Sequence, residues 1–200
     1  MYVFCSDLEG VWIPEVWINV ARITGIDDLK LTTRDINDYD VLMKRRISIL
    51  KQHNLTLKDI QNVISEIQPL EGAKDMLWWI RHNAQLYILS DTFIEFANPL
   101  MEKLDRPSLF CNNLVVDNKG MIVDYTLRQK DQKREVVKAF HGMNYKVVAF
   151  GDSYNDISML QEADAGILFR PPQNVINDFP QFPVVNTYLE LKDQLQKYIG

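Results

Sequence analysis

Short apolar runs alternate with helical spacing along most of this chain. The first run, residues 2–6, has the character of a buried strand, and similar runs occupy 86–89, 109–116, 146–150 and 165–168. Between them, apolar residues three or four positions apart predict helices over about 72–82, 93–104, 155–162 and 187–198, and another from about Lys133. Such repeated strand–helix units favour an α/β fold, with a parallel sheet and helices on both of its faces.

Residues 14–67 break this alternation, because they show helical spacing only. We expect one helix from Pro14 to a stop at Gly25, a second over 42–54 and a third over 56–67. Thr56 and Asp59 have the spacing of a weak capping box at the start of the third helix. Residues 117–120 have the composition of a hairpin turn, with 121–127 returning from it. The sequence therefore predicts a helical insertion directly after the first strand.

Composition limits the classes of partner. The 200 residues suit one domain or a core with a modest insertion, and the net charge of −5 is spread without a basic patch, which argues against a nucleic-acid partner. Cys5 and Cys111 lie in apolar segments, so we interpret both as small buried hydrophobes. No stretch is suited to a signal peptide or a membrane span, so we expect a cytoplasmic protein with no membrane partner.

Paired carboxylates follow two of the predicted strands. Asp7 and Glu9 come after residues 2–6, and Asp152 and Asp156 come after 146–150. The carboxyl ends of parallel strands gather at one edge of a sheet, so these four acids should meet, and hard oxygen ligands suit Mg²⁺. Each acid has a plainer interpretation as a turn former or helix cap. The spacing of Asp7 and Glu9 also allows one to act as nucleophile or ligand while the other transfers protons.

The middle strand and the following helix supply further candidates. Ser90 ends the strand at 86–89 and could donate its hydroxyl to a phosphate oxygen, although Ser90, Asp91 and Thr92 also suit a turn or a helix cap. Lys130 and Lys133 precede or open a helix, where solvated lysines are common. One basic residue is needed to neutralise a phosphoryl group in transfer, and from the residues alone either lysine could serve.

In this order, residues 7–11, Ser90, Lys133 and the run 151–156 resemble the four motifs of the haloacid dehalogenase (HAD) phosphatase superfamily. The resemblance covers essentially the whole chain and implies a core of 1–13 and 70–200 with a helical cap of 14–69. It is most similar to phosphoserine phosphatases, and in particular to their bifunctional phosphoserine phosphatase/phosphoserine:homoserine phosphotransferase branch. The segments 33–36, 38–44 and 179–183 resemble that branch.

The resemblance implies a role for each matching residue. Asp7 would attack phosphorus and become an aspartyl-phosphate, and Glu9 would protonate the leaving serine oxygen and then activate water or an acceptor hydroxyl. Mg²⁺ would be held by Asp7, Asp152 and the backbone carbonyl of Glu9, with Asp156 supporting it through water. The predicted substrate-binding residues are Glu15, Arg46, Ser90, Asp91, Lys133 and Asn155.

Glu15 and Arg46 match cap positions that recognise the amine and the carboxylate of phosphoserine, and Arg46 could grip a carboxylate with two parallel hydrogen bonds. The plainer interpretation of Arg46 is a solvated helix face, Lys44-Arg45-Arg46. Two departures from the family pattern leave room for transfer to an alcohol. Glu9 stands where Asp is usual, and Asp91 stands where Gly often follows the motif serine; Asp91 could orient an acceptor amine or point away.

Phosphoserine, with homoserine as a second acceptor, is therefore the expected substrate class, and a homodimer is compatible with the sequence. Two alternatives remain open. One is a HAD phosphatase for another small phosphate, such as a sugar or nucleotide. The other is a catalytically idle HAD-fold binding protein, although a binding module has no use for both Asp7 and Glu9.

Overall fold

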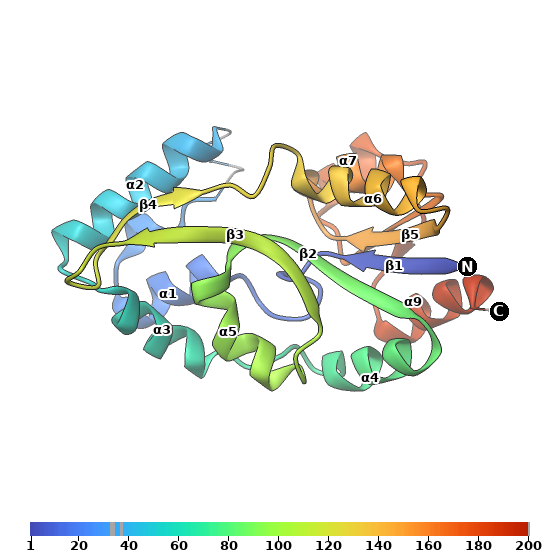
Figure 1. Cartoon of the computed structure of the whole chain (residues 1–200), viewed down its shortest axis with the longest axis horizontal. Helices are drawn as coiled ribbons and strands as arrows, with labels where there is room; N and C mark the ends of the chain where they lie inside the picture. The colour runs from blue at the N-terminus through green and yellow to red at the C-terminus, as the bar shows by residue number, and fades with distance from the viewer. Residues whose placement is uncertain (33–34, 37, 200) are drawn as a thin grey trace.

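The computed structural model describes residues 1–32, 35–36 and 38–199 (Figure 1). A seven-stranded sheet with the strand order β4-β3-β2-β1-β5-β6-β7 forms its centre. Every neighbouring pair is parallel except β3 and β4, which form the hairpin expected around 117–120, so the sheet is mixed and mostly parallel. The strands are β1 (Tyr2–Ser6), β2 (Gln85–Phe93), β3 (Ser108–Val116), β4 (Ile122–Thr126), β5 (Lys146–Gly151), β6 (Ala165–Phe169) and β7 (Val184–Val185).

Helices join these strands and cover both faces of the sheet (Figure 1). They are α1 (Val16–Thr24), η1 (Asp27–Lys30), α2 (Tyr39–Gln52), α3 (Leu57–Glu66), α4 (Ala73–Asn83), α5 (Ile94–Lys103), α6 (Gln132–Gly142), η2 (Tyr154–Asp156), α7 (Ile157–Glu162), α8 (Gln173–Asp178), α9 (Tyr188–Leu195) and η3 (Gln196–Tyr198). The sequence pattern did not predict η1, α8 or β7, because elements of two to six residues are too short to show a period.

Alternation along the inner strands divides the core into two layers. Phe4 and Phe150 point to the face covered by α4, α5 and α9, whereas Val3, Cys5 and Val147 point to the face covered by α6 and α7. A strand with both faces covered has a continuous apolar sequence, which is why residues 2–5 are apolar and the polar Ser6 comes only at the end of the strand. The expected burial of the two cysteines is confirmed, since both Cys5 and Cys111 are buried.

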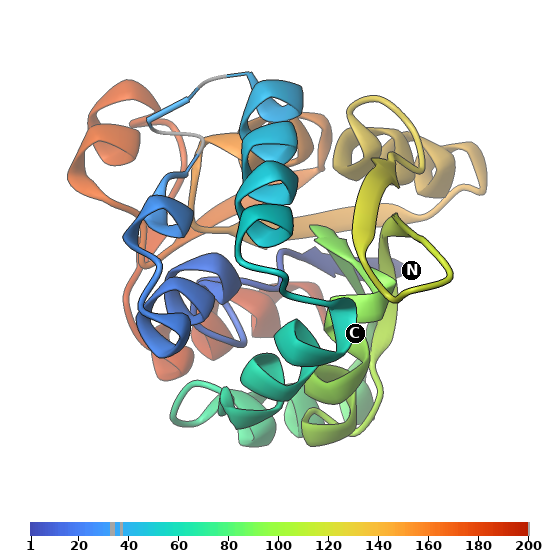
Figure 2. The same ribbon diagram turned by 90° about the vertical axis from the view of Figure 1, so that its left-hand side faces the viewer.

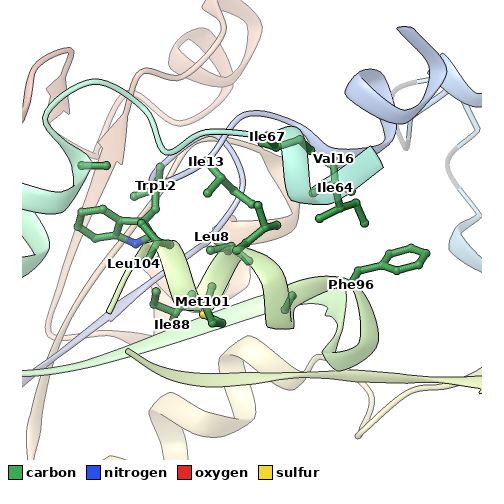
Figure 3. Packing of buried hydrophobic residues seen from close by; sticks show 14 of the residues in the cluster. Leu8, Trp12, Ile13, Val16, Ile64, Ile67, Ile88, Phe96, Met101 and Leu104 are labelled. Carbon is green, nitrogen blue, oxygen red and sulfur yellow. The ribbon is translucent and has the colours of Figure 1, made fainter. Parts of the chain in front are cut away.

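The helices of the insertion lie together at the end of the molecule that faces the viewer in Figure 2. There α1 packs on α3, α3 on α5, and α2 on β4. The capping box between Thr56 and Asp59 is formed at the start of α3. Val16, Ile64 and Phe96, from three different helices, belong to one buried apolar cluster in this packing (Figure 3). The branch-like segment 33–36 lies partly outside the described residues, because the description omits Thr33 and Arg34.

Two boundaries near the strand ends differ from the prediction. Strand β2 does not stop at 89 but continues to Phe93, so Ser90 and Asp91 lie within the strand instead of in a turn or helix cap. Asp156 lies at the end of the short η2 turn and not within the helix predicted over 155–162, because α7 begins only at Ile157. Among the described residues, no helix is both long and apolar enough to cross a membrane.

Candidate functional site

The carboxyl ends of β1, β2 and β5 meet at one edge of the sheet, beside the helices of the insertion (Figure 1). Asp7 follows β1 directly, and its backbone N–H donates to the carbonyl of Phe150 in β5 at 3.1 Å. Its own carboxylate accepts the N–H of Leu8 at 2.7 Å, which fixes the side chain against the strand end. Adjacent parallel strands therefore deliver the two acidic motifs to the same place, as the sequence predicted.

Lys133 is the centre of the charged cluster. It lies in the first turn of α6, is 2% exposed, and its Nζ is 2.7 Å from Asp156, 3.0 Å from Asp7 and 3.5 Å from Asp91. Burial alone would lower the pKa of this ammonium, but the three carboxylates outweigh burial and raise the pKa well above its usual value. The structure thus brings Lys133 into the site, whereas Lys130 is exposed.

Asp156 ties the loop after β5 into a compact turn. One of its carboxylate oxygens accepts from Lys133, and the other accepts the backbone N–H groups of Asp152 and Ser153 at 2.9 and 3.1 Å. Gly151 is required beside it, because a Cβ there would lie 2.3 Å from the Asp156 carboxyl carbon. Both oxygens of Asp156 therefore have protein partners, which suits a supporting role.

Asp7, Asp152 and Asp156 are buried, and each offers an oxygen within 4.8 Å of the others. Gly10, at φ +74°, packs directly against this group, since a Cβ on Gly10 would lie 2.6 Å from the Asp152 carboxyl carbon. Gly10 thus allows the backbone to approach Asp152 closely. A cradle of hard carboxylate oxygens around a position shaped by glycine fits a divalent cation such as Mg²⁺.

The acids of the site repel one another. Burial and the neighbouring Asp156 raise the pKa of Asp7, and Asp152 and Asp91 act in the same direction, while Lys133 opposes them. Lys133 supplies a single positive charge against these four carboxylates. The surplus of negative charge is a second reason why the site suits a cation.

Asp91 points into the site and not away from it. Its carboxylate accepts from Gln132 at 3.0 Å and from Asn155 at 3.0 Å, in addition to its contact with Lys133. Burial would raise the pKa of Asp91, but Lys133 and these hydrogen bonds hold it below its usual value. Its backbone carbonyl accepts from the Tyr39 hydroxyl of α2 and from Asn112 of β3, both at 3.1 Å.

Ser90 and Asn155 border the same space. The Ser90 side chain is 2% exposed and accepts the N–H of Thr92, while its carbonyl accepts from Gln132 at 2.8 Å. Asn155 is exposed and bonds both Asp91 and Ser153. Sequence reasoning missed Gln132, although its position next to Lys133 at the start of a predicted helix was the available signal.

Glu9 faces the insertion. Its carboxylate accepts the backbone N–H of Val16, the first residue of α1, at 2.7 Å. Burial raises the pKa of Glu9 to about 8, and the adjacent carboxyl of Glu15 adds to the effect. A carboxyl that is protonated near neutral pH can donate a proton, which is what a general acid must do. Asp7 and Glu9 thus belong to two different environments, one made by the core and one by α1. The prediction that the four acids meet therefore holds for Asp7, Asp152 and Asp156, whereas the Glu9 carboxylate faces Val16.

Arg46 lies buried in α2, at 7% exposed, and does not belong to a solvated helix face. Its Nη2 donates to the carbonyl of Leu31 at 2.9 Å, and its guanidinium lies over the ring of Trp17. Its Nε–H has no hydrogen-bond partner among the described residues. Burial lowers the pKa of Arg46 to about 10, against the opposing influence of Glu9, Tyr39 and Glu15. A buried cation with an unpartnered donor is suited to bind an anion.

Comparison with known proteins agrees with this geometry. The sequence profile of the haloacid dehalogenase-like hydrolases matches residues 8–164. The chain is 56% identical to the phosphoserine phosphatase ThrH of Pseudomonas aeruginosa over 98% of its own length and 96% of that protein. It is also 56% identical to a phosphoserine phosphatase of Pseudomonas syringae pv. tomato, over 98% of this chain and 82% of the relative.

Solved structures resemble the fold as a whole. A phosphoserine phosphatase described as a substrate-bound complex superposes with a TM-score of 0.76 at 22% identity, covering 99% of this chain and 98% of that one. A phospho-aspartyl intermediate analogue of phosphoserine phosphatase gives the same TM-score and the same coverage of both chains. At this identity the likeness shows the fold, namely an α/β sheet with a helical insertion after β1.

Proposed function

The chain belongs to the haloacid dehalogenase-like hydrolases, and on that premise we propose that it is a Mg²⁺-dependent phosphoserine phosphatase acting through Asp7. The names of its close relatives support the substrate, and the buried acids with Lys133 support the chemistry. The observation that carries the proposal is Arg46, because its unpartnered buried donor is suited to an anion. The carboxylate of phosphoserine is such an anion.

Each of the three charged parts of phosphoserine would have a partner in this arrangement. The phosphoryl oxygens would contact Lys133 and the hydroxyl of Ser90, the amine would meet Glu15, and the carboxylate would meet Arg46. The hydrogen bond from the Tyr39 hydroxyl to the Asp91 carbonyl connects α2, which carries Arg46, to β2, which carries Ser90. Lys133 already holds the carboxylate of Asp7 at 3.0 Å, so it can fix the nucleophile and neutralise charge on the phosphoryl group.

In the first step a carboxylate oxygen of Asp7 forms a bond to phosphorus while the bond from phosphorus to the serine oxygen breaks. Glu9 gives its proton to that leaving oxygen. In the second step water attacks the aspartyl-phosphate, Glu9 takes a proton from this water, and the bond from phosphorus to Asp7 breaks, which restores both carboxyls. When bound, Mg²⁺ held by Asp7, Asp152 and the Glu9 carbonyl, with Asp156 in support, would supply positive charge to the phosphoryl oxygens.

Homoserine is the second acceptor we propose. Its hydroxyl can take the place of water in the second step, with the same proton passing to Glu9. The contact that favours this reading is between Glu9 and the Val16 N–H: the longer side chain of Glu9 reaches the start of α1 and so joins the acid/base to the wall of the substrate site.

Purified protein with Mg²⁺ and phosphoserine, with and without homoserine, tests the proposal by ³¹P NMR. We expect inorganic phosphate in the first case and phosphohomoserine in addition in the second; inorganic phosphate alone in both would refute the transfer reaction. Asp7→Asn should abolish turnover with an unchanged circular dichroism spectrum, and retained turnover would refute the covalent mechanism. A sugar phosphate hydrolysed faster than phosphoserine would refute the substrate.

A further inference from the structure

The guanidinium of Arg46 lies over an aromatic ring and forms no salt bridge with an acid among the described residues. Its Cζ lies 4.5 Å from the centroid of the Trp17 ring, and both side chains are more than nine-tenths buried. Tryptophan is the aromatic side chain that attracts a cation most strongly, and the attraction grows when water is excluded. Trp17 therefore stabilises the buried charge without using the Nε–H donor of Arg46.

The other contacts of Arg46 are also neutral. Nη2 donates to the Leu31 carbonyl at 2.9 Å, and Nη1 lies 3.7 Å from the sulfur of Met43. A carboxylate bonded to the guanidinium would compete with an anionic ligand, whereas a ring face, a carbonyl and a thioether do not cancel the charge. The Trp17 ring covers the guanidinium and occupies none of its N–H donors, and the Nε–H has no hydrogen-bond partner among the described residues.

Trp17 itself is held by a contact outside the insertion. Its ring meets that of Phe96 in α5 edge to face, with 5.5 Å between centroids, and Phe96 meets Phe93 in the same way at 5.8 Å. The platform under Arg46 is thus built from α1 and supported by α5 and the end of β2. Its position is set by the packing of the insertion on the core.

We infer that Trp17 is a positioning residue that sets selectivity for phosphate esters bearing a carboxylate, by holding Arg46 charged and oriented. The inference rests on the proposed function, in which Arg46 receives the substrate carboxylate. Trp17 does not touch the reacting atoms, so its removal should weaken recognition of the carboxylate and leave the phosphoryl-transfer step intact.

The experiment compares phosphoserine with phosphoethanolamine, which keeps the phosphate and the amine but has no carboxylate. In Trp17→Met a flexible apolar side chain fills much of the space without a ring face. We expect kcat/KM for phosphoserine to fall about tenfold, equivalent to about 1.4 kcal/mol, mainly through KM. The value for phosphoethanolamine should change by less than about twofold. Trp17→Phe, which restores a ring, should recover most of the loss.

Phe140→Met is the matched control, because it removes a buried ring from the layer on the other face of the sheet, where Phe140 contacts Tyr87 and not Trp17. It should lower the melting temperature and affect both substrates alike. Site-specific replacement of Trp17 by a fluorinated tryptophan weakens the ring's attraction for cations without changing its shape, so it serves even if Trp17→Met does not fold. It should lower selectivity for phosphoserine in the same direction.

Equal losses for the two substrates in Trp17→Met, or unchanged selectivity with the fluorinated ring, would overturn the inference and leave Trp17 a packing residue. Failure of the proposed function has a different signature. In that case the unaltered protein would show no preference for phosphoserine over phosphoethanolamine, whatever residue stands at position 17.

Discussion

At the scale of single residues, the best-predicted part of the site is the part that follows strands. Asp7 and Asp152 could be placed from sequence because parallel strands bring their carboxyl ends to one edge, whatever the rest of the chain does. Lys133 was separable from Lys130 only by family resemblance, and the structure supplies the physical reason: one is enclosed by three acids and the other is exposed.

Asp91 shows where residue-level prediction stops. The sequence left two orientations of the Asp91 side chain open: it could orient an acceptor amine or point away from the site. In the structure its carboxylate joins Gln132, Lys133 and Asn155, which come from two further segments of the chain. The spacing of residues within one segment cannot predict these contacts, because they depend on how β2, α6 and η2 pack.

Gly10 gives the sharpest prediction at this scale. Gly10→Ala should place a Cβ 2.6 Å from the Asp152 carboxyl carbon in a backbone with φ +74°, so Asp152 must move. We expect at least a hundredfold loss of kcat/KM for phosphoserine at fixed Mg²⁺, partly regained at higher Mg²⁺, because misplacing a reacting or ligating group by about an ångström costs on this order. Steady-state kinetics over a Mg²⁺ series measures both effects.

Gly25→Ala is the control for backbone strain alone. Gly25 has φ +71° but no atom within 4 Å of the Cβ position. Both substitutions should cost about 1–2 kcal/mol of stability from the left-handed backbone, and only Gly10→Ala should lose activity. Equal activity in the two variants would contradict the assigned contact between Gly10 and Asp152.

At the scale of elements, long periodic segments were predicted and short ones were not. The helices α2, α3 and α4 follow from apolar spacing and, for α3, from its capping box. The extension of β2 to Phe93 was not predicted, because its last residues are held by tertiary contacts and not by an apolar pattern. Asn112 of β3 and Tyr39 of α2 both bond the Asp91 carbonyl in that extension.

Two tyrosine hydroxyls connect α2 to the core, and they make a matched pair. The Tyr39 hydroxyl donates to the Asp91 carbonyl beside the site, and the Tyr125 hydroxyl of β4 donates to Asp40 on the outer surface at 2.8 Å. Tyr39→Phe should raise KM for phosphoserine several-fold and lower stability by about 1 kcal/mol, the worth of one hydrogen bond. Kinetics and thermal unfolding measure the two changes.

Tyr125→Phe removes a hydroxyl between the same two regions but away from the site. It should leave KM within about twofold, because exposed hydrogen bonds contribute little. Amide hydrogen exchange of residues 39–52 should quicken in Tyr39→Phe and hardly change in Tyr125→Phe. A KM that rises equally in both variants would mean that general loosening of α2, and not the bond to Asp91, causes the effect.

At the scale of the whole molecule, two covered sheet faces provide the stability that allows one edge to be electrostatically unfavourable. The layers on either face are almost wholly apolar, whereas the site concentrates Asp7, Asp91, Asp152 and Asp156 around Lys133. A sequence shows that such acids exist, but the balance of their charges follows only from the folded arrangement. The fold therefore holds a site that a cation should stabilise as a whole.

Mg²⁺ should accordingly raise the melting temperature. Binding to the folded state alone stabilises it by about 2.7 kcal/mol at one hundred times the dissociation constant, which for a chain of this size corresponds to a rise of about 5–10 °C. A chelator should reverse the rise, and differential scanning calorimetry measures it.

Asp152→Asn should abolish most of the shift by removing a carboxylate that faces Gly10, whereas Asp193→Asn, an equal charge change on the exposed side of α9, should preserve it. A shift of the same size in Asp152→Asn would mean that the cation binds at another site. A site built on Asp7, Asp152 and Asp156 cannot lose one of its three carboxylates without losing affinity.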